Sequence, residues 1–332
     1  MVLSGCVSTA LDIDSRAEIA IPAKVRSVMR SKNMSAADPV LIRIFKQESE
    51  LEVWKRNRSG RYALLKTYPM CRWSGQLGPK KAEGDRQAPE GVYRVSLAGL
   101  NPRSQYFLSF DLGYPNKLER AKGYTGSALM VHGACSSSGC FAISDEYVTE
   151  VYSVVRDALR AGQSSVQVQS LPFRMTPENL AKHSDNRNFD FWLNLKEATT
   201  RFEVLRQPPR FQFCEGRYRF GKVRAGTVPE NPLGGCPQFD PVPEAVGAKM
   251  ASDAANTEKL KAENASSALA YVDGGMHSSF RKVLANAGAS ALAKRTSTGS
   301  VPVSKPRAAL QDPYTGGGIL IDKRGSKSGI DN

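Results

Sequence analysis

The chain has 332 residues, and its 46 Lys and Arg outnumber its 32 Asp and Glu, which gives a formal net charge of +14. This length accommodates one large domain with additional segments, and an apolar fraction of 41% supports a packed core. A basic surface attracts nucleic acids, anionic lipids and anionic wall polymers alike, but no nucleic-acid-binding motif accompanies the charge, so we expect no nucleic-acid partner. No run of about 18 apolar residues occurs, which excludes a membrane-spanning helix.

The N-terminus carries a pattern of exported proteins. Leu3-Ser4-Gly5-Cys6 resembles the lipobox of bacterial lipoproteins, in which a signal peptidase cuts before the cysteine and lipid is attached to its sulfur. Too few residues precede Cys6 to form the basic and apolar start of such a signal, so this interpretation requires an upstream start. The alternative is a chance tetrapeptide. Residues 1–37 are predicted to be a lipobox-like segment and a tether with one short helix.

The cysteines and histidines limit the metal chemistry that we expect. The three histidines and six cysteines form no zinc-finger spacing, so a histidine-based metal site is not predicted. With Cys6 lipidated and Cys140 a free thiol, four cysteines remain for structural or disulfide roles. Their pairing cannot be read from the sequence, and they are Cys71, Cys135, Cys214 and Cys236.

Strand patterns dominate the chain between residues 38 and 131. Ser59-Gly60 predicts a turn within a meander, and the last strand leads directly into His132. The predicted strands are rich in β-branched and aromatic residues and cover 40–45, 51–54, 62–65, 92–95, 106–110 and 129–131.

Helical patterns begin after residue 143. Ser144 is a favourable N-cap, and Asp145 and Glu146 suit the positive end of the helix dipole. An apolar stripe at helical spacing then extends to Leu159, before Gly162. The remaining predicted elements are a strand at 166–168, a short helix from Thr176-Pro177, a helix over 189–205 and a hairpin over 211–220.

The composition changes near residue 223. Prolines cluster between 229 and 243, and the following residues are rich in Ala, Ser, Asn, Lys and Gly, with few large apolar side chains. Such a segment buries too little apolar surface to offset the entropy of ordering. Residues 223–332 are therefore predicted to be a disordered tail with a transient helix over 249–272. A chain that ends near residue 225 should keep its melting temperature and turnover.

The segment from Gly126 to Ala142 contains the candidate chemistry. A strand leads to His132, a loop of Gly and Ser follows, and Cys140 stands before the helix capped by Ser144. Cysteine is a nucleophile as the thiolate, and a neighbouring imidazole accepts its proton. Backbone N–H groups in a turn of Ser138, Gly139 and Cys140 are suited to a developing oxyanion. The alternative is a buried cysteine and an unrelated loop histidine.

This segment resembles the His-Gly…Ser-x-Gly-Cys signature of the L,D-transpeptidase catalytic domain, the YkuD-type family. Gly84-Asp85-Arg86-Gln87-Ala88-Pro89-Glu90-Gly91-Val92-Tyr93 is similar to the family's G-D-x-x-x-P-x-G-x-Y element. Further stretches resemble this family or its subgroup of murein L,D-transpeptidase-like proteins of Gram-negative bacteria, and they cover 43–46, 51–54, 68–80, 109–116 and 172–176. The resemblance extends over residues 38–222, the predicted catalytic domain.

The resemblance implies a mainly β sandwich with flanking helices and a cysteine acyltransferase that acts on peptidoglycan stem peptides at the L-centre of meso-diaminopimelate. It assigns Cys140 as nucleophile, His132 as base and the carbonyl of Gly133 as the group that holds the imidazole. Ser138 and Gly139 belong to the oxyanion loop, and the resemblance implies no metal or cofactor. The location implied is the periplasm, with a lipid anchor at Cys6, and carbapenem-type inhibitors would acylate Cys140.

The sequence departs from many family members in two places. No histidine occurs among residues 1–131, and Ala142 stands where an arginine often follows the cysteine. Substrate-contacting positions therefore differ, and the acyl acceptor stays open. Water as acceptor would make the protein an L,D-carboxypeptidase or an amidase that releases wall-linked lipoprotein, and a further alternative is an inactive wall-binding lipoprotein.

Three other residues lie near the predicted site. Tyr114 and Arg86 are candidates for the substrate groove, with packing or surface positions as the alternative. Cys135 has three alternatives, which are a resolving thiol, a disulfide partner of Cys71 and a plain loop cysteine.

Overall fold

The computed structural model describes residues 15–224, 230–263, 271 and 273–310. Within these ranges the strands form two five-stranded sheets and one hairpin. Residues in β1 are all buried, including Arg43, as in a strand that is covered on both faces.

The first sheet has the order β3-β2-β1-β10-β5, and only its β1–β10 pair is parallel. Its strands are β1 (Val40–Phe45), β2 (Glu50–Arg56), β3 (Tyr62–Pro69), β5 (Gly91–Val95) and β10 (Val166–Leu171).

The second sheet has the order β4-β9-β8-β7-β6, and its β8–β9 pair is parallel. Its strands are β4 (Arg72–Trp73), β6 (Leu100–Asn101), β7 (Ser109–Asp111), β8 (Met130–His132) and β9 (Phe141–Ala142). This sheet carries the Cys140 segment, because Cys140 directly precedes β9.

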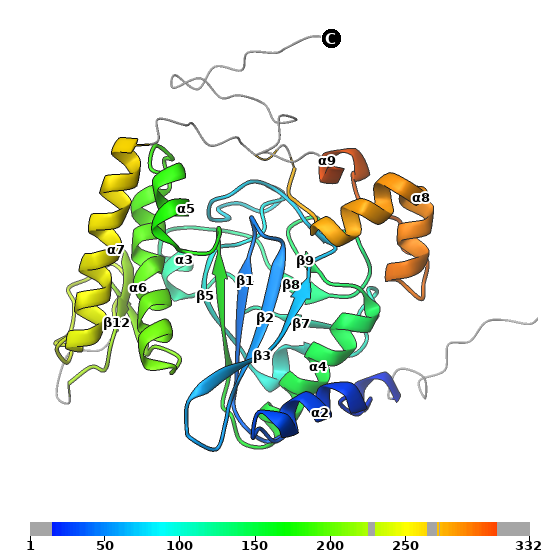
Figure 1. Ribbon diagram of the computed structural model, residues 1–332, viewed down its shortest axis with the longest axis horizontal. Helices are drawn as coiled ribbons and strands as arrows, with labels where there is room; N and C mark the ends of the chain where they lie inside the picture. The colour runs from blue at the N-terminus through cyan, green and yellow to red at the C-terminus, as the bar shows by residue number, and fades with distance from the viewer. Residues whose placement is uncertain (1–14, 225–229, 264–270, 272, 311–332) are drawn as a thin grey trace, which may run out of the picture.

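Helix α4 (Asp145–Arg160) joins the two sheets into one core (Figure 1). The Oγ of Ser144 accepts from the N–H of Tyr147, so the predicted N-cap is confirmed. The valines of α4, including Val148 and Val151, pack into one cluster with β1, β2 and β5 of the first sheet and β7, β8 and β9 of the second. The short helix α2 (Ala23–Ser31) adds Val25 and Met29 to this cluster.

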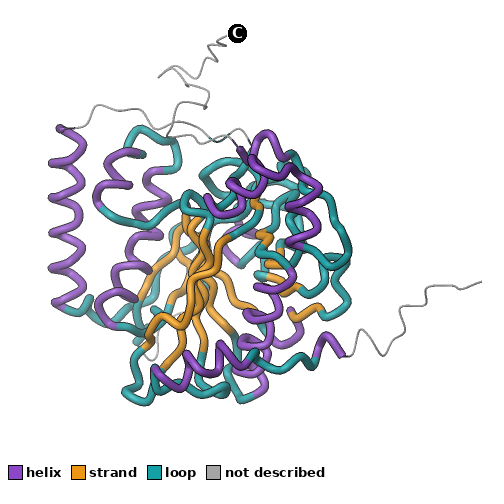
Figure 2. Tube along the Cα trace, turned by 45° about the vertical axis from the view of Figure 1, so that its right-hand side comes forward, coloured by secondary structure: helices purple, strands orange, loops and turns teal. Residues whose placement is uncertain are grey.

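A second apolar cluster lies between the first sheet and a group of helices. Trp192 and Leu195 of α6 (Phe189–Leu205) pack there with Phe173, beside the hairpin of β11 (Phe211–Cys214) and β12 (Arg217–Phe220). The remaining elements of this region are α3 (Lys117–Ala121) and α5 (Pro177–Lys182), whereas the short 3-10 helix η1 (Leu97–Gly99) contacts α4. The expected fold class, β-sheets with flanking helices, is confirmed (Figure 2).

The chain beyond residue 222 contains helices where the composition predicted disorder. Helix α7 (Glu244–Glu263) lies against α5 and α6, whereas α8 (Ser278–Thr296) and α9 (Pro306–Leu310) lie at the other end of the molecule (Figure 1). The expectation of a disordered tail with a transient helix over 249–272 is thus corrected for the described residues 230–263 and 273–310. Its few large apolar side chains, among them Phe280, Leu284 and Leu292, are buried against the catalytic domain, and an average composition does not show which individual side chains are buried.

Two predictions concern residues outside the described ranges. The lipobox-like segment with Cys6 and the Gly-rich residues 311–332 both lie there. Among the helices that the structure describes, none combines the length and the apolar character that crossing a membrane requires.

Candidate active site

Cys140 and His132 are brought together by the parallel pairing of β8 and β9. The register pairs Val131 with Phe141 and His132 with Ala142. Because side chains alternate between the faces of a sheet, Cys140 continues the face on which His132 lies. The predicted pair therefore shares one face, on adjacent segments of the second sheet.

The thiol of Cys140 is free and partly exposed. The N–H of Met130 lies 3.4 Å from its Sγ, and the carbonyl of Ala128 lies 3.6 Å away. Burial raises the pKa of the Cys140 thiol above its ordinary value. A neutral thiol is thus the resting form, and its activation requires a proton acceptor.

The imidazole of His132 is fixed in place. Its Nδ1 lies 2.6 Å from the carbonyl of Gly133, and its ring stacks on Tyr106 with centroids 4.5 Å apart. Burial lowers the pKa of His132 to about 4. Since a carbonyl only accepts, Nδ1 carries the proton and Nε2 keeps its lone pair. His132 is therefore a neutral base in the resting protein.

The backbone at Gly133 leaves no room for a side chain. A Cβ there would lie 2.3 Å from Oδ1 of Asp145 and 2.7 Å from the carbonyl of Tyr106. The same Asp145 oxygen accepts from the N–H of Ala134 at 2.8 Å. The first turn of α4 thus holds the peptide that orients His132.

The loop before Cys140 is organised by Ser137. Its Oγ donates to the carbonyl of Cys140 at 2.8 Å, lies 2.9 Å from Oγ of Ser74 and accepts from the N–H of Gly139 at 3.3 Å. Gly139 has φ of +129°, a conformation that favours glycine. Ser138 is exposed. The predicted loop residues are therefore adjacent to Cys140, and the N–H of Gly139 is already engaged.

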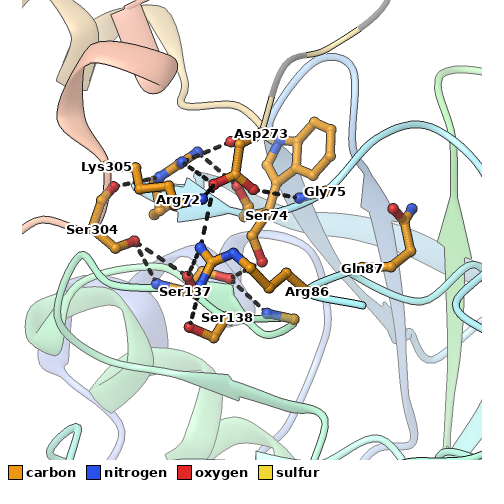
Figure 3. Close-up of polar contacts among 12 residues, drawn as sticks. Arg72, Ser74, Gly75, Arg86, Gln87, Ser137, Ser138, Asp273, Ser304 and Lys305 are labelled. Carbon is orange, nitrogen blue, oxygen red and sulfur yellow. Dashed lines mark hydrogen bonds and ion pairs between the residues drawn. The ribbon is translucent and has the colours of Figure 1, made fainter. Parts of the chain in front are cut away.

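The two candidate groove residues differ in placement. Arg86 is partly exposed and reaches the loop, where it donates to Oγ of Ser138 at 3.0 Å and to the carbonyl of Ser137 at 3.3 Å (Figure 3). Tyr114 is only 4% exposed, and its hydroxyl lies 3.3 Å from the carbonyls of Lys80 and Thr125. This placement favours the packing alternative for Tyr114, because a buried ring does not reach substrate.

Two disulfides answer the open question of cysteine pairing. Cys71 pairs with Cys135, and Cys214 pairs with Cys236. Cys140 is the free cysteine among the described residues. Cys135 is therefore a disulfide partner, and the alternatives of a resolving thiol or a plain loop cysteine do not apply to this state.

Residues far along the chain also reach this site, and the sequence did not indicate them. Asp273 accepts from Arg86 and from the N–H of Gly75, and Ser304 contacts Ser137 (Figure 3). No local pattern marks them, because they are isolated polar residues in a polar segment. Within the described residues, no group of three His, Cys, Asp or Glu side chains converges as metal ligands would.

Comparisons with known proteins identify relatives of this chain. YafK of Escherichia coli K12, which is named as an L,D-transpeptidase on a provisional basis, is 39% identical over 228 residues, covering 69% of this chain and 90% of its own. The chain belongs to the L,D-transpeptidase family. The YafK of Escherichia coli O157:H7 matches to the same extent. Residues 39–169 also match the L,D-transpeptidase catalytic domain (YkuD), and this region contains His132 and Cys140.

Among solved structures, this L,D-transpeptidase family member has distant matches. The helical cell shape determining protein Pgp2 of Campylobacter jejuni is 16% identical with a TM-score of 0.34, over 57% of this chain and 80% of that chain. Bd1075 of Bdellovibrio bacteriovorus is 18% identical with a TM-score of 0.31, over 51% of this chain and 61% of that chain.

Proposed function

We propose that the protein is an L,D-transpeptidase that acts on peptidoglycan stem peptides, with Cys140 as nucleophile and His132 as base. One observation carries this proposal. His132 is held as a neutral base with Nε2 unprotonated, on the strand beside the free thiol of Cys140. His132 is not among the hydrogen-bond partners of Cys140, which is common in substrate-free enzymes, where such bonds tighten on binding.

The reaction begins when Nε2 of His132 takes the proton of Sγ. The thiolate attacks the carbonyl carbon at the L-centre of diaminopimelate and forms a tetrahedral oxyanion. Because the N–H of Gly139 is bonded to Ser137, we assign the N–H of Cys140 to this oxyanion. Collapse breaks the peptide bond, His132 returns the proton to the leaving amine, and a thioester on Cys140 remains. An amine or water then attacks the thioester.

A hydrolase is the second candidate, because water resolves the same thioester. Ala142 is fully buried where many family members carry arginine. This position offers no charge to a second stem peptide, and that observation favours water as acceptor. The product would be that of an L,D-carboxypeptidase, or a wall-linked lipoprotein released by amidase action.

The test measures acylation and product together. The protein is incubated with a carbapenem, and the adduct on Cys140 is followed as a mass increase. A disaccharide-tetrapeptide, with and without an amine acceptor, then separates transfer from hydrolysis. We expect Cys140→Ala to lose all acylation and His132→Gln to be slower by about 10²–10⁴-fold, with both variants folded. An unlabelled wild type with intact fold would instead support an inactive wall-binding lipoprotein.

We also propose a periplasmic location with lipid on Cys6. Two disulfides beside a free thiol support an oxidising compartment. The test is expression from an upstream start in a Gram-negative host with a fatty-acid probe. The wild type should be labelled and fractionate with membranes, whereas Cys6→Ser should not. An unlabelled wild-type protein in the cytoplasm would contradict this proposal.

A further inference from the structure

Asp273 links the C-terminal part of the chain to the catalytic domain. The residue is 8% exposed, and its Oδ1 accepts from the N–H of Gly75 at 3.1 Å. Its Oδ2 lies 3.3 Å from Arg86 and 3.0 Å from Lys305. Burial by itself would raise the pKa of Asp273, but the N–H of Gly75 and the ammonium of Lys305 hold it below its ordinary value. Asp273 is therefore a buried carboxylate, and Arg86 is one of its counter-charges.

Arg86 transmits this charge to the loop before Cys140. One nitrogen of its guanidinium donates to Ser138 Oγ, and the other is shared between the Ser137 carbonyl and Asp273 (Figure 3). Charge-assisted bonds of this kind fix geometry because the guanidinium is planar and its donors are rigid. The two loop residues held by Arg86 are those that precede the turn at Gly139.

Ser304 holds the same loop from a second direction. The N–H of Ser137 donates to Oγ of Ser304 at 2.9 Å, and this hydroxyl lies 3.3 Å from the Ser137 carbonyl. The C-terminal segment thus contacts both sides of the Ser137 peptide. The bonds of Asp273 and Ser304 described here reach Arg86 and the loop, and none of them involves Cys140 or His132 directly.

We propose that Asp273 is a positioning residue for acylation, which acts through Arg86 to hold the Ser137–Gly139 turn so that the N–H of Cys140 faces the oxyanion. The proposal rests on the proposed function of Cys140. A fixed donor stabilises a developing oxyanion without reorganisation, so a loosened loop slows the chemical step more than it weakens binding. Arg86 then serves as the link to the loop.

The test variant is Asp273→Asn, which keeps the shape and the acceptor for Gly75 but removes the charge. Saturation kinetics of carbapenem acylation should give a maximal rate lowered by about tenfold to a hundredfold, as expected for the loss of a charge-assisted bond. The half-saturation concentration should stay near that of the wild type, and thermal melting should show that the variant is folded at the assay temperature. Lys305→Gln is the matched control, because Lys305 pairs with the same carboxylate and does not contact the loop. Its acylation rate should be unchanged.

A double-mutant cycle separates positioning from a purely structural contribution. Arg86→Gln should be slow, and adding Asp273→Asn to it should slow it no further, because the link is already broken. Two results would overturn the proposal when Cys140 is acylated in the wild type. One is an equal slowing by Asp273→Asn in the wild type and in Arg86→Gln, and the other is a wild-type rate in Asp273→Asn. If the wild type itself is not acylated, the proposed function is refuted and the positioning proposal with it.

Discussion

The two C-terminal parts of the chain pack on the catalytic domain in different ways. Helix α7 buries only Val246, Asp253 and Thr257, and its anchor is the ion pair of Asp253 with Lys196 at 2.5 Å. The segment 273–310 instead forms an apolar cluster with the Cys71–Cys135 disulfide. Its apolar members are Met276, Phe280, Leu284, Leu292, Ala293, Val303 and Ala309.

The segment 273–310 also extends the sheet that carries the site. Gly275 forms a bridge with Trp73 of β4, and β4 pairs with β9, which follows Cys140. Gly288 in α8 has φ of +78°, and this kink lets the two halves of the helix face the same cluster. The comparison indicates that α7 contributes stability alone, whereas 273–310 contributes stability and the shape of the site.

The largest expected effect comes from removing the segment 273–310 while keeping helix α7. A chain that ends at Glu263 should lose on the order of 5 kcal/mol in the free energy of unfolding, because its partner apolar surface becomes exposed. Its acylation rate should fall at least about a hundredfold, since a fixed loop conformation is lost. Thermal melting and mass-detected acylation measure the two.

The control is a chain that ends at Leu310, which keeps all described contacts and should match the full chain. Full activity in the chain ending at Glu263 would show that the composition-based expectation of a dispensable tail was right for chemistry. It would also remove the distinction between the two parts.

Two buried cations offer a matched pair of smaller effects. Arg72 is fully buried and donates to the carbonyls of Ser304 at 2.9 Å and Asp273 at 2.7 Å, while Lys196 pairs with Asp253 of α7. Arg72→Met should destabilise by about 3 kcal/mol, because buried carbonyls lose their donor, and Lys196→Met should destabilise less, because Lys249 still pairs with Asp253. Only Arg72→Met should also slow acylation. Chemical denaturation with parallel acylation assays distinguishes them, and a comparable slowing in Lys196→Met would remove the contrast.

These contacts mark the limit of what the sequence predicts. Cys140, His132 and the capping Ser144 follow from a local pattern, because one loop connects strand, nucleophile and helix. The contact of Arg72 with Asp273 joins residues 201 positions apart, and no periodicity in a polar segment announces it. The disulfide pairing cannot be predicted for the same reason, because the fold decides which of the four cysteines lie close together.

Burial also decides cases that residue type leaves open. Tyr114 looked suited to a substrate groove, yet its ring packs 6.4 Å from that of Tyr93 inside the core. The sequence also leaves open whether Arg86 lines the groove or lies on the surface. In the structure Arg86 pairs with Asp273 and contacts the loop before Cys140. A side chain's charge or aromaticity therefore predicts the kind of contact, and the fold determines the partner.

The smallest expected effect is the pH dependence of stability and activity. His132 reports on the catalytic site, and His183 reports on the α7 side of the molecule. Burial lowers the pKa of His132 in β8, and that of His183 at the end of α5, to about 4 from an ordinary 6.5. The unfolded chain then binds more protons between pH 4 and pH 6.5, so the free energy of unfolding is highest above 6.5 and falls as the pH is lowered toward 4. At pH 5.5 each histidine should account for about 1 kcal/mol of this loss.

The variants His132→Gln and His183→Gln separate stability from chemistry. Each should flatten the pH dependence of unfolding, as measured by denaturant titration between pH 4 and pH 7. The acid limb is the fall of the acylation rate at low pH, and only His132→Gln should remove it. In the wild type this limb should lie well below pH 6.5, because the imidazole stays neutral in the folded protein. His183 directly follows α5, which contacts α7, and its ring packs on Phe173 and Trp192, so His183→Gln should leave the limb in place. An acid limb that persists in His132→Gln would exclude His132 as the base, whereas its loss in His183→Gln would mean that the α7 side of the molecule is coupled to the site after all.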